Sequence, residues 1–353
     1  MSEVKFNNLS DIEEEYDINF EESDKVNEQL ILDIFNEKIK PNNNLFAETS
    51  DGYIEYIFGL YYDQNDDTDD NMIKYYEESC KKGNVIAMYE LGHYYEDEED
   101  YTNMIKYYLM AIEKDDVDAM CNLGCYYQEQ EDYVNMTKYF LMAIEKGDES
   151  SMNNLANYYY DIKDDDENAI KYWLMAIEKN SNDAINNLAD YYRDKDQIDN
   201  MMKYYNMGIE KGDNDSLFNL GSYYEDEEDY DNMKKYYLEA IDKEHDDAML
   251  ALSDYYYKKI HSDLEIDAVK NMLKYAIMAI DYNDDYLEEF EDKCKEIFKN
   301  YNYVMHTELN KIEDKTDLIN DKIRSLKKKM KKNKKPETYE ILQIENFLGR
   351  TKK

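Results

Sequence analysis

The sequence of 353 residues has few of the residues that break or cross-link a chain: 10 glycines, 2 prolines and 4 cysteines. So little glycine and proline argues against a loop-rich β fold and against a collagen-like or linker-dominated chain. Residues 1–20 lack the apolar stretch of a secretory signal, and no run approaches the roughly 18 apolar residues that read as a transmembrane helix. We therefore interpret the cysteines as free thiols of a reducing compartment. They are Cys80, Cys121, Cys125 and Cys294.

Positive charge is also scarce, since 83 acidic residues against 42 basic ones give a net charge of −41. Nucleic-acid affinity comes mainly from lysine and arginine side chains that neutralise phosphates. A phosphate-binding surface that extends over the whole protein is therefore excluded. We expect an intracellular, cytoplasmic protein, with the nucleus as the alternative compartment.

Tyrosine, in contrast, is abundant, with 39 residues, and it recurs in a fixed register. A Tyr-Tyr pair begins at positions 61, 94, 126, 158, 191, 223 and 255, so the steps are 32 or 33 residues. The lysine of a Lys-Tyr-aromatic cluster recurs at 74, 106, 138, 171, 203 and 235, with a looser copy at 274. This regularity indicates a tandem array of about seven copies over residues 52–280.

Each copy contains two apolar patterns of helical spacing. In the third copy, Ala119, Leu123 and Tyr126 share one helix face, and a second pattern runs from Tyr133 to a Lys-Gly pair that ends at Gly147. Gly147 fits a left-handed helix cap. Connections this short force neighbouring helices to be antiparallel. Because a single helix pair cannot bury its apolar face alone, the copies must be stabilised by stacking on one another.

Small residues occupy one column in each helix of the copy. Glycine inside a helix costs about 1 kcal/mol relative to alanine, so we predict that two helix backbones approach closely at these columns. The first-helix column is Gly59, Gly92, Gly124, Ala156, Ala189, Gly221 and Ser253, and the second-helix column is Ser79, Ala111, Ala143, Ala176, Gly208, Ala240 and Ala279. A third column is predicted to hold mainly structural hydrogen-bonding groups, with contact to a peptide backbone as the alternative. It consists of Asn122, Asn154, Asn187 and Asn219.

The copies resemble tetratricopeptide (TPR) and Sel1-like repeats. The stretch Asn122-Leu-Gly-Cys-Tyr-Tyr, followed by Asp132-Tyr133 and Ala143, is similar to the TPR pattern, and the Ala-Ile-Glu-Lys-Gly-Asp segment after it is similar to the Sel1 signature. The resemblance implies an all-α fold, an α-solenoid wound as a right-handed superhelix of about seven helix-turn-helix repeats with helical caps. It also implies a non-enzymatic scaffold or adaptor. In composition the chain resembles repeat proteins encoded by giant DNA viruses of amoebae.

In TPR-like proteins the first helices line a concave groove, and the resemblance maps this groove onto the columns that vary among the copies. The groove so predicted is acidic, aromatic and amide-rich, and complementary potentials favour a basic partner segment. Its predicted residues are Tyr89, His93, Glu96, Cys125, Gln128, Asn153, Asn157, Tyr160, Asn186, Asp190, Arg193, Phe218, Ser222, Glu225 and Asp254.

The flanks differ from the repeats. Residues 1–24 are acidic and predict a disordered tail, and residues 25–51 predict a capping helix with a linker. Residues 281–353 predict further helices, with a heptad-like seam from Leu309 to Met330 that suits either a dimerising coiled coil or a capping hairpin. The oligomeric state therefore stays open.

A basic run at 324–335 suggests an alternative function, a structural or packaging protein whose arm contacts nucleic acid or an anionic surface. Nucleic acid is otherwise an unexpected partner. The arm consists of Arg324, Lys327, Lys328, Lys329, Lys331, Lys332, Lys334 and Lys335.

The sequence shows no catalytic constellation, and we expect no catalytic residue, no metal and no cofactor. The four histidines lie in separate segments and belong to no zinc-binding pattern. Cys121 and Cys125 are four residues apart without a further ligand nearby in sequence. The acidic loop after Asp63 has Thr68 where an EF-hand needs glycine. The sequence also lacks the glycine-rich loops of the Walker and Rossmann motifs, which bind nucleotide phosphates.

Overall fold

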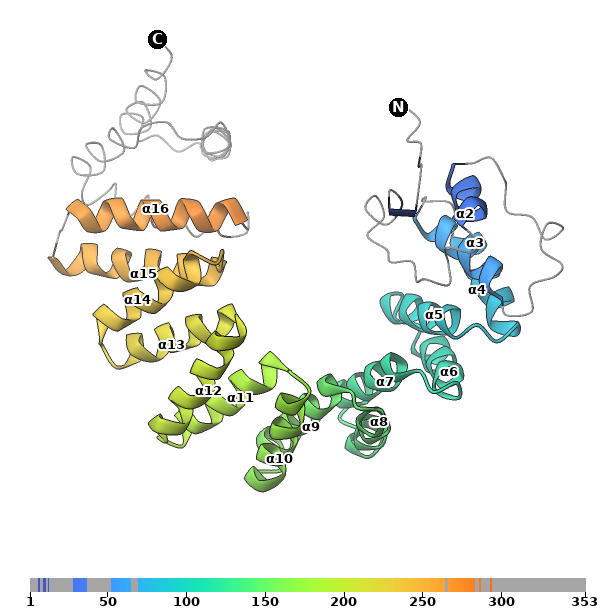
Figure 1. Cartoon of the computed structure of the whole chain (residues 1–353), viewed down its shortest axis with the longest axis horizontal. Helices are drawn as coiled ribbons and strands as arrows, with labels where there is room; N and C mark the ends of the chain where they lie inside the picture. The colour runs from blue at the N-terminus through green and yellow to red at the C-terminus, as the bar shows by residue number, and fades with distance from the viewer. Residues whose placement is uncertain are drawn as a thin grey trace, which may run out of the picture. The chain divides into compact units, whose positions relative to one another are not determined.

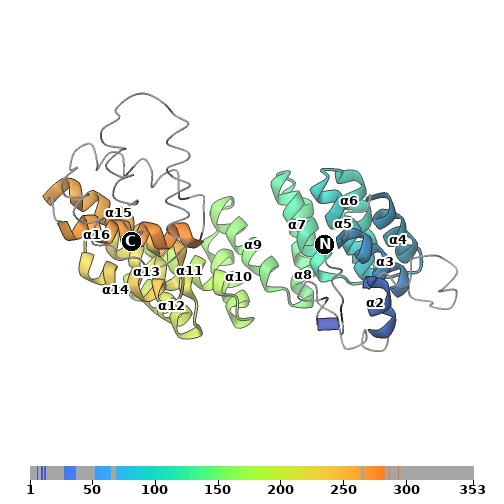
Figure 2. The same cartoon turned by 90° about the horizontal axis from the view of Figure 1, so that it is seen from above.

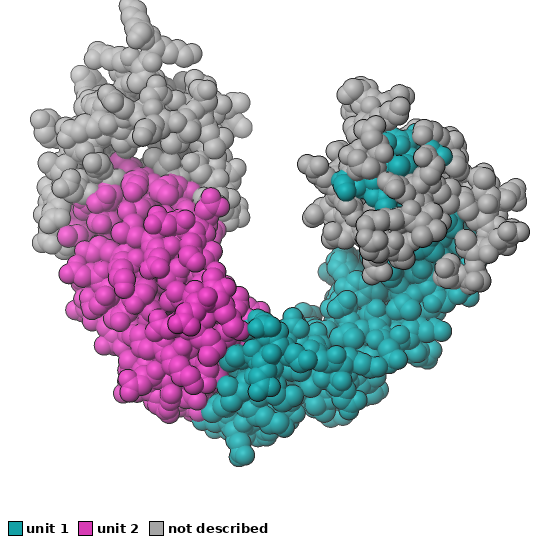
Figure 3. Space-filling view, in the orientation of Figure 1, with its two compact units in different colours: residues 1–181 teal, residues 182–353 magenta. Residues whose placement is uncertain are grey.

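The computed structural model describes residues 28–36, 52–64, 69–263 and 266–282, together with positions 6, 9, 10, 12, 286 and 293. The chain divides into two compact units, residues 1–181 and residues 182–353 (Figure 3). The basic arm at 324–335, the seam from 309 to 330 and most of the predicted tail lie outside the described residues.

Fifteen α-helices make up the described part of the chain, and no strand occurs within it. Unit 1 contains α2 (Glu28–Phe35), α3 (Tyr53–Gln64), α4 (Asp69–Lys81), α5 (Val85–Asp97), α6 (Tyr101–Ile112), α7 (Val117–Glu129), α8 (Tyr133–Lys146), α9 (Glu149–Asp161) and α10 (Asp166–Glu178). Unit 2 contains α11 (Asn182–Asp194), α12 (Ile198–Lys211), α13 (Asn214–Asp226), α14 (Tyr230–Ile241), α15 (Asp246–Asp263) and α16 (Ile266–Tyr282).

The helices form seven consecutive helix-turn-helix copies, from α3/α4 to α15/α16 (Figures 1 and 2). The predicted all-α repeat fold, with about seven copies, is therefore confirmed. None of the described helices is both long enough and apolar enough to cross a bilayer.

Acidic and amide side chains start the helices at fixed positions of the copy. Asp132 caps α8 by accepting the backbone N–H of Asn135 at 3.2 Å, and the Asn135 amide donates back to the same carboxylate at 2.7 Å. Asp116 caps α7 through the N–H of Ala119 at 2.8 Å. Such caps satisfy N–H groups that have no partner inside the helix. Some of the many aspartates of the sequence thus cap the N-termini of helices.

The second helices end in a residue of left-handed backbone. The predicted cap at Gly147 is confirmed, with φ of 96°, and Gly212 has the same role with φ of 87°. Asp115, Asn180 and Glu244 occupy the equivalent positions in other copies with φ of 68°, 73° and 68°. Glycine adopts this conformation without strain, whereas other residues are strained by contact of Cβ with the backbone.

The glycines of the first-helix column lie under an aromatic ring of the second helix. A Cβ at Gly92 would be 2.4 Å from the Tyr108 ring, and one at Gly221 would be 2.5 Å from the Tyr237 ring. The predicted close approach is therefore correct, but its cause differs from the prediction, because a side-chain ring and not a second backbone fills the space.

Each copy also contains a stacked tyrosine pair covered by the recurrent lysine. In the second copy, Tyr95 of α5 stacks on Tyr107 of α6 with ring centroids 5.6 Å apart, and Lys106 Nζ lies 4.1 Å from the centre of the Tyr107 ring. The same arrangement recurs in all seven copies. Cation–π attraction of this kind contributes about 0.5–1 kcal/mol at exposed sites, which explains why the lysine recurs with the tyrosines.

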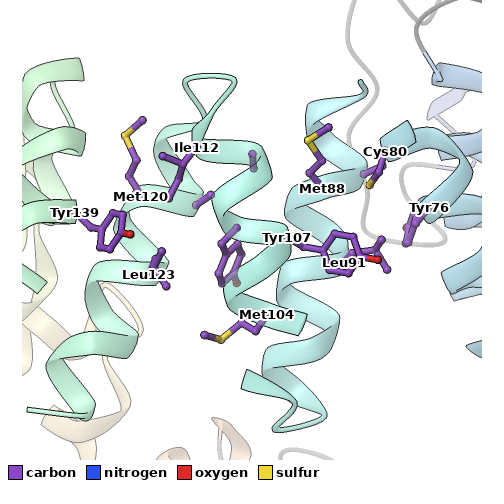
Figure 4. Close-up of a cluster of buried hydrophobic side chains, with 14 of the residues drawn as sticks. Tyr76, Cys80, Met88, Leu91, Met104, Tyr107, Ile112, Met120, Leu123 and Tyr139 are labelled. Atoms are coloured by element: carbon purple, nitrogen blue, oxygen red, sulfur yellow. The ribbon is translucent and has the colours of Figure 1, made fainter. Parts of the chain in front are cut away.

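The apolar core continues from copy to copy. Figure 4 shows Met88 and Leu91 of α5, Met104 of α6 and Leu123 of α7 within one cluster of unit 1. The cluster also includes Tyr76 of α4. Within this cluster the second and third copies share their buried side chains, so neither has a core of its own.

Part of the predicted disordered tail is packed on the first copy. Phe6, Leu9 and Ile12 are buried together with Ile31 of α2. The Phe6 backbone also exchanges two hydrogen bonds with the Asn36 side chain, at 2.8 and 2.9 Å. Apolar residues three apart thus pack with α2 despite the acidic residues around them, and the disordered tail stays a prediction.

Candidate functional site: the first-helix face

The buried aromatic ring of each second helix connects to the face of the first helix. In the second copy, the Tyr108 hydroxyl donates a hydrogen bond to Glu96 Oε2 at 2.6 Å. In the sixth copy, the Tyr237 hydroxyl donates to Glu225 Oε2 at 3.0 Å. Both carboxylates are half-buried, and in both copies the ring lies over a glycine. The first-helix face therefore displays carboxylates whose positions are fixed by hydrogen bonds from buried tyrosine side chains.

Copies with alanine in the glycine column direct the same ring elsewhere. The Tyr205 hydroxyl donates to Asp190 at 2.5 Å, and Trp173 Nε1–H donates to Asn157 Oδ1 at 2.9 Å. The acceptors are two residues after the signature leucine, whereas Glu96 is five residues after it. The alanine copies also lack a carboxylate at the position of Glu96, where they have Tyr160 and Arg193.

Burial changes the acidity of these groups. It raises the pKa of the Tyr108, Tyr205 and Tyr237 hydroxyls, because ionisation there would place a charge in a partly dehydrated site beside a carboxylate. Burial also raises the pKa of Asp190, although the hydrogen bond from Tyr205 and the nearby Arg193 act in the opposite direction. The Asp190 carboxylate is thus partly dehydrated, which strengthens any contact that it makes with a cation.

A row of aromatic residues lies beside the carboxylates. Tyr89 packs on Tyr108 with ring centroids 5.9 Å apart. Phe218 stacks on Tyr237 at 5.7 Å and on His245 at 4.9 Å. These rings pack on the tyrosines whose hydroxyls hold Glu96 and Glu225.

The asparagine column links one copy to the previous one. Asn122 Nδ2 donates to the Tyr89 hydroxyl at 3.2 Å and is 3.3 Å from the Tyr108 hydroxyl, both in the preceding copy. Asn154 Nδ2 lies 3.5 Å from Cys125 Sγ. The predicted structural role is confirmed for these two residues.

Two of the predicted groove residues are buried. Asn153 and Asn186 are each 8% exposed. Asn186 donates to Asp213 Oδ2 at 2.9 Å and accepts from Ser216 Oγ at 2.7 Å, so its amide joins two copies. The burial of both amides favours a packing role, and the predicted contact of Asn153 and Asn186 with a partner stays a prediction.

The other predicted residues lie at or near the surface of the first helices. Gln128 is exposed, and His93 is exposed with its Nδ1 3.4 Å from Asp97. Arg193 NH2 is 3.4 Å from Asp190 Oδ1. The rest are half-buried: Tyr160 packs against Trp173 with centroids 5.6 Å apart, Ser222 lies near Tyr237, and Asp254 pairs with Lys293.

His245 and the two cysteines of α7 make local contacts with neighbouring groups. His245 lies with Asp246 and Asp247 at the start of α15, and its Nδ1 accepts the N–H of Ala248 at 3.3 Å while Nε2 faces Asp215 at 3.1 Å. Nδ1 therefore caps α15, and Nε2 has Asp215 of α13 as its partner. In the thiol pair of α7, the hydrogen bond with Cys125 and burial together raise the pKa of Cys121.

One acidic residue of the face was missing from the predicted groove. Glu90 occupies the position of the asparagine column in the second copy, and it is half-buried. Burial and the neighbouring Asp63 raise its pKa, and His93 acts in the opposite direction. The available signal was a glutamate in the second copy at a column that holds asparagine in the third to sixth copies.

The tetratricopeptide repeat family model matches residues 85–114 and 215–242. These spans contain α5 and α6 of the second copy and almost all of α13 and α14 of the sixth. The two copies are tetratricopeptide-like repeats. No curated protein sequence matches the chain, so the resemblance to proteins of giant viruses stays a prediction.

Several solved helical-repeat proteins are similar to the chain. One is c5321, a protective antigen of uropathogenic Escherichia coli with an SLR fold, at 16% identity over 87% of this chain and 70% of that chain, with a TM-score of 0.49. A Sel1 repeat protein from Oxalobacter formigenes has 21% identity over 50% of this chain and 77% of that chain, with a TM-score of 0.43. Yeast Tom70 has 15% identity over 95% and 65% of the two chains, with a TM-score of 0.42.

Proposed function

We propose that the chain is a non-enzymatic adaptor whose first-helix faces bind a basic segment of a partner protein. Repeats of this kind are typical of protein-interaction scaffolds and are generally not enzymes. The proposal applies to the face of each unit separately, that is, to α3, α5, α7 and α9 in unit 1 and to α11, α13 and α15 in unit 2.

The fixed carboxylates carry the proposal. Glu96, Asp190 and Glu225 are held by hydroxyl groups of buried tyrosines at 2.6, 2.5 and 3.0 Å. A carboxylate has about four acceptor positions, so these bonds leave acceptor capacity for a partner. Because the side chains are already ordered, a cation that binds them has less conformational entropy to overcome. The aromatic rings beside them add attraction for lysine or arginine.

The test uses fluorescein-labelled octalysine, with octaglutamate as the comparison, and measures fluorescence anisotropy with the full chain. We expect octalysine to bind and octaglutamate not to bind. Binding should weaken as salt rises, because salt screens exposed charges over about 10 Å at 0.1 M. If octaglutamate binds as well as octalysine, the proposal is wrong.

Variants locate the binding face without disturbing the tyrosine contacts. His93→Lys and Gln128→Lys together add two positive charges at exposed positions of α5 and α7. The matched control adds the same charges on the second helices of the same two copies, through Thr102→Lys and Val134→Lys, both at exposed positions. We expect the first pair to weaken octalysine binding several-fold more than the control pair. Equal effects would show that attraction by the net charge, and not this face, binds the peptide.

The alternative function rests on the basic run at 324–335, which lies outside the described residues. Removal of residues 322–353 separates the two functions. An adaptor that uses the first-helix faces keeps its octalysine affinity after the truncation. A packaging protein loses a salt-sensitive affinity for DNA instead.

A further inference from the structure

A buried tyrosine hydroxyl in unit 1 differs from its equivalents in other copies. Tyr76 is 2% exposed, its ring covers Gly59 and stacks on Tyr56 with centroids 6.0 Å apart, and its hydroxyl has no hydrogen-bond partner among the described residues. The equivalent hydroxyl of Tyr108 has two neighbours, Glu96 at 2.6 Å and Asn122 at 3.3 Å.

The difference follows from two replacements. The residue equivalent to Glu96 is Asp63, which is one methylene shorter, and the residue equivalent to Asn122 is Glu90. An asparagine amide donates hydrogen bonds, whereas an ionised glutamate only accepts them. Between α3 and α5, the position that an amide NH2 group fills in the next copy is therefore surrounded by acceptors.

The geometry points to a socket for one lysine ammonium group of the partner, formed by the carboxylates of Asp63 and Glu90 and the hydroxyl of Tyr76. This inference rests on the proposed function and names the anchor residue of the bound segment. Its second support is independent of the acidic cluster, namely the buried Tyr76 hydroxyl that shares this site.

The chemistry of the socket selects an ammonium group. A lysine ammonium has three N–H donors, which match two carboxylates and one hydroxyl oxygen. Tyr56 and Tyr89 line the same stretch of the face and offer ring surfaces to the positive charge. Calcium needs six to eight oxygen ligands, more than this set supplies. The planar guanidinium of arginine is larger than the amide group that fills the equivalent space in the next copy.

The experiment measures octalysine binding to the full chain carrying Glu90→Gln. The matched control is Glu145→Gln, which removes the same charge at an exposed position of α8. Losing one hydrogen-bonded charge contact should weaken binding about tenfold, whereas the control should change it by less than about twofold. Thermal melts followed by circular dichroism check folding, and Asp63→Asn gives a second variant if Glu90→Gln is unstable.

The outcomes separate this inference from the function on which it rests. If wild-type protein does not bind octalysine, both fail. If it binds, but Glu90→Gln and Asp63→Asn match Glu145→Gln, the binding face stands and the socket is wrong. A second peptide of eight trimethyl-lysines keeps the charge without N–H donors. We expect the wild type to bind this peptide more weakly than octalysine, whereas Glu90→Gln should bind the two peptides equally. Equal binding of the two peptides by the wild type would overturn the socket.

The pH dependence gives a further readout. Burial raises the pKa of Glu90, and the groups that face it are Asp63 on α3, Tyr76 on α4 and His93 on α5. On acidification Glu90 takes up its proton before ordinary glutamates do, so wild-type affinity should begin to fall at a higher pH than that of Glu90→Gln. The comparison uses a His93→Gln background, so that no histidine beside Glu90 contributes to either profile. Identical profiles would contradict the inference.

Discussion

At the scale of single residues, the contact between a glycine and an aromatic ring positions the hydroxyl that holds a carboxylate on the first helix. Tyr108 can lie over Gly92 and reach Glu96 only because position 92 has no Cβ. Where Ala189 replaces the glycine, Tyr205 reaches Asp190 instead. The face differs as well, since Asp190 stands where the second copy has His93, and Arg193 stands where it has Glu96. The small residue under the ring and the acceptor on the face therefore change together from copy to copy.

Gly92→Ala should consequently destabilise the chain, although the same change in an ordinary helix is stabilising by about 1 kcal/mol. The new Cβ would lie 2.4 Å from the Tyr108 ring. Overpacking of this kind costs about 1–3 kcal/mol, and urea unfolding measures it. A midpoint equal to or above that of the wild type would show that the ring moves aside freely.

The residues of the predicted groove show how far single positions can be assigned from sequence. The columns of Glu96, Asp190 and Glu225 were found because they vary among copies, and the structure places these side chains on the first-helix face. Asn186 belongs to a similar column but is buried. Helical spacing gives the direction of a side chain only to within the width of a helix face, so it cannot separate a groove residue from one that contacts the next copy.

At the scale of the helix, the termini are determined locally. Aspartate or asparagine caps the starts of α5 to α8, and left-handed residues end the second helices. Three of these left-handed positions are glycine, at 83, 147 and 212, and others are not. The array therefore contains helix ends that are strained, where the left-handed residue is not glycine, and equivalent helix ends that are unstrained, where it is glycine.

Glu244→Gly should relieve this strain at the end of α14, where Glu244 has φ of 68°. We expect a gain of about 0.5–1 kcal/mol, because the left-handed conformation costs an ordinary residue about 1–2 kcal/mol and glycine gives back part of this as unfolded-state entropy. Gly212→Ala is the reverse control, since φ is 87° there and no atom lies within 4 Å of the new Cβ. It should lower the melting temperature. A rise in both variants, or a fall in both, would contradict this explanation.

At the scale of the whole chain, stability depends on contact between successive copies. The core cluster of unit 1 includes side chains from α4 to α8, and Asn122 joins its copy to the previous one. An array built in this way tolerates the loss of a whole period better than the loss of half of one.

Deletion of residues 117–148 tests this property. It removes α7 and α8 and joins Asp116 to Glu149, so Asp116 takes over the capping position of Asp148 at the start of α9. We expect a shortened chain with the same helical content per residue, measured by circular dichroism, and a cooperative urea transition at lower stability. Deletion of 117–132 removes α7 alone and should abolish cooperative unfolding, because the faces of α6 and α8 lose their partner. Similar transitions in both deletions would show that the helices do not depend on their neighbours.

The sequence by itself determined the period, the two helices of each copy, the cap at Gly147 and the all-α repeat fold. These features depend on spacing along the chain, and helical geometry converts that spacing directly into faces and turns. Only the tertiary structure decided that rings cover the glycines, that lysines cover the stacked tyrosines, and that Glu90 lies with Asp63 and Tyr76. The contacts of the glycines and of Glu90 join residues about 14 or more positions apart on different helices. The stacked tyrosines of a copy also come from two helices, whereas each lysine is adjacent in sequence to the tyrosine that it covers. The geometry of these contacts depends on how the helices pack, which a periodic pattern does not contain.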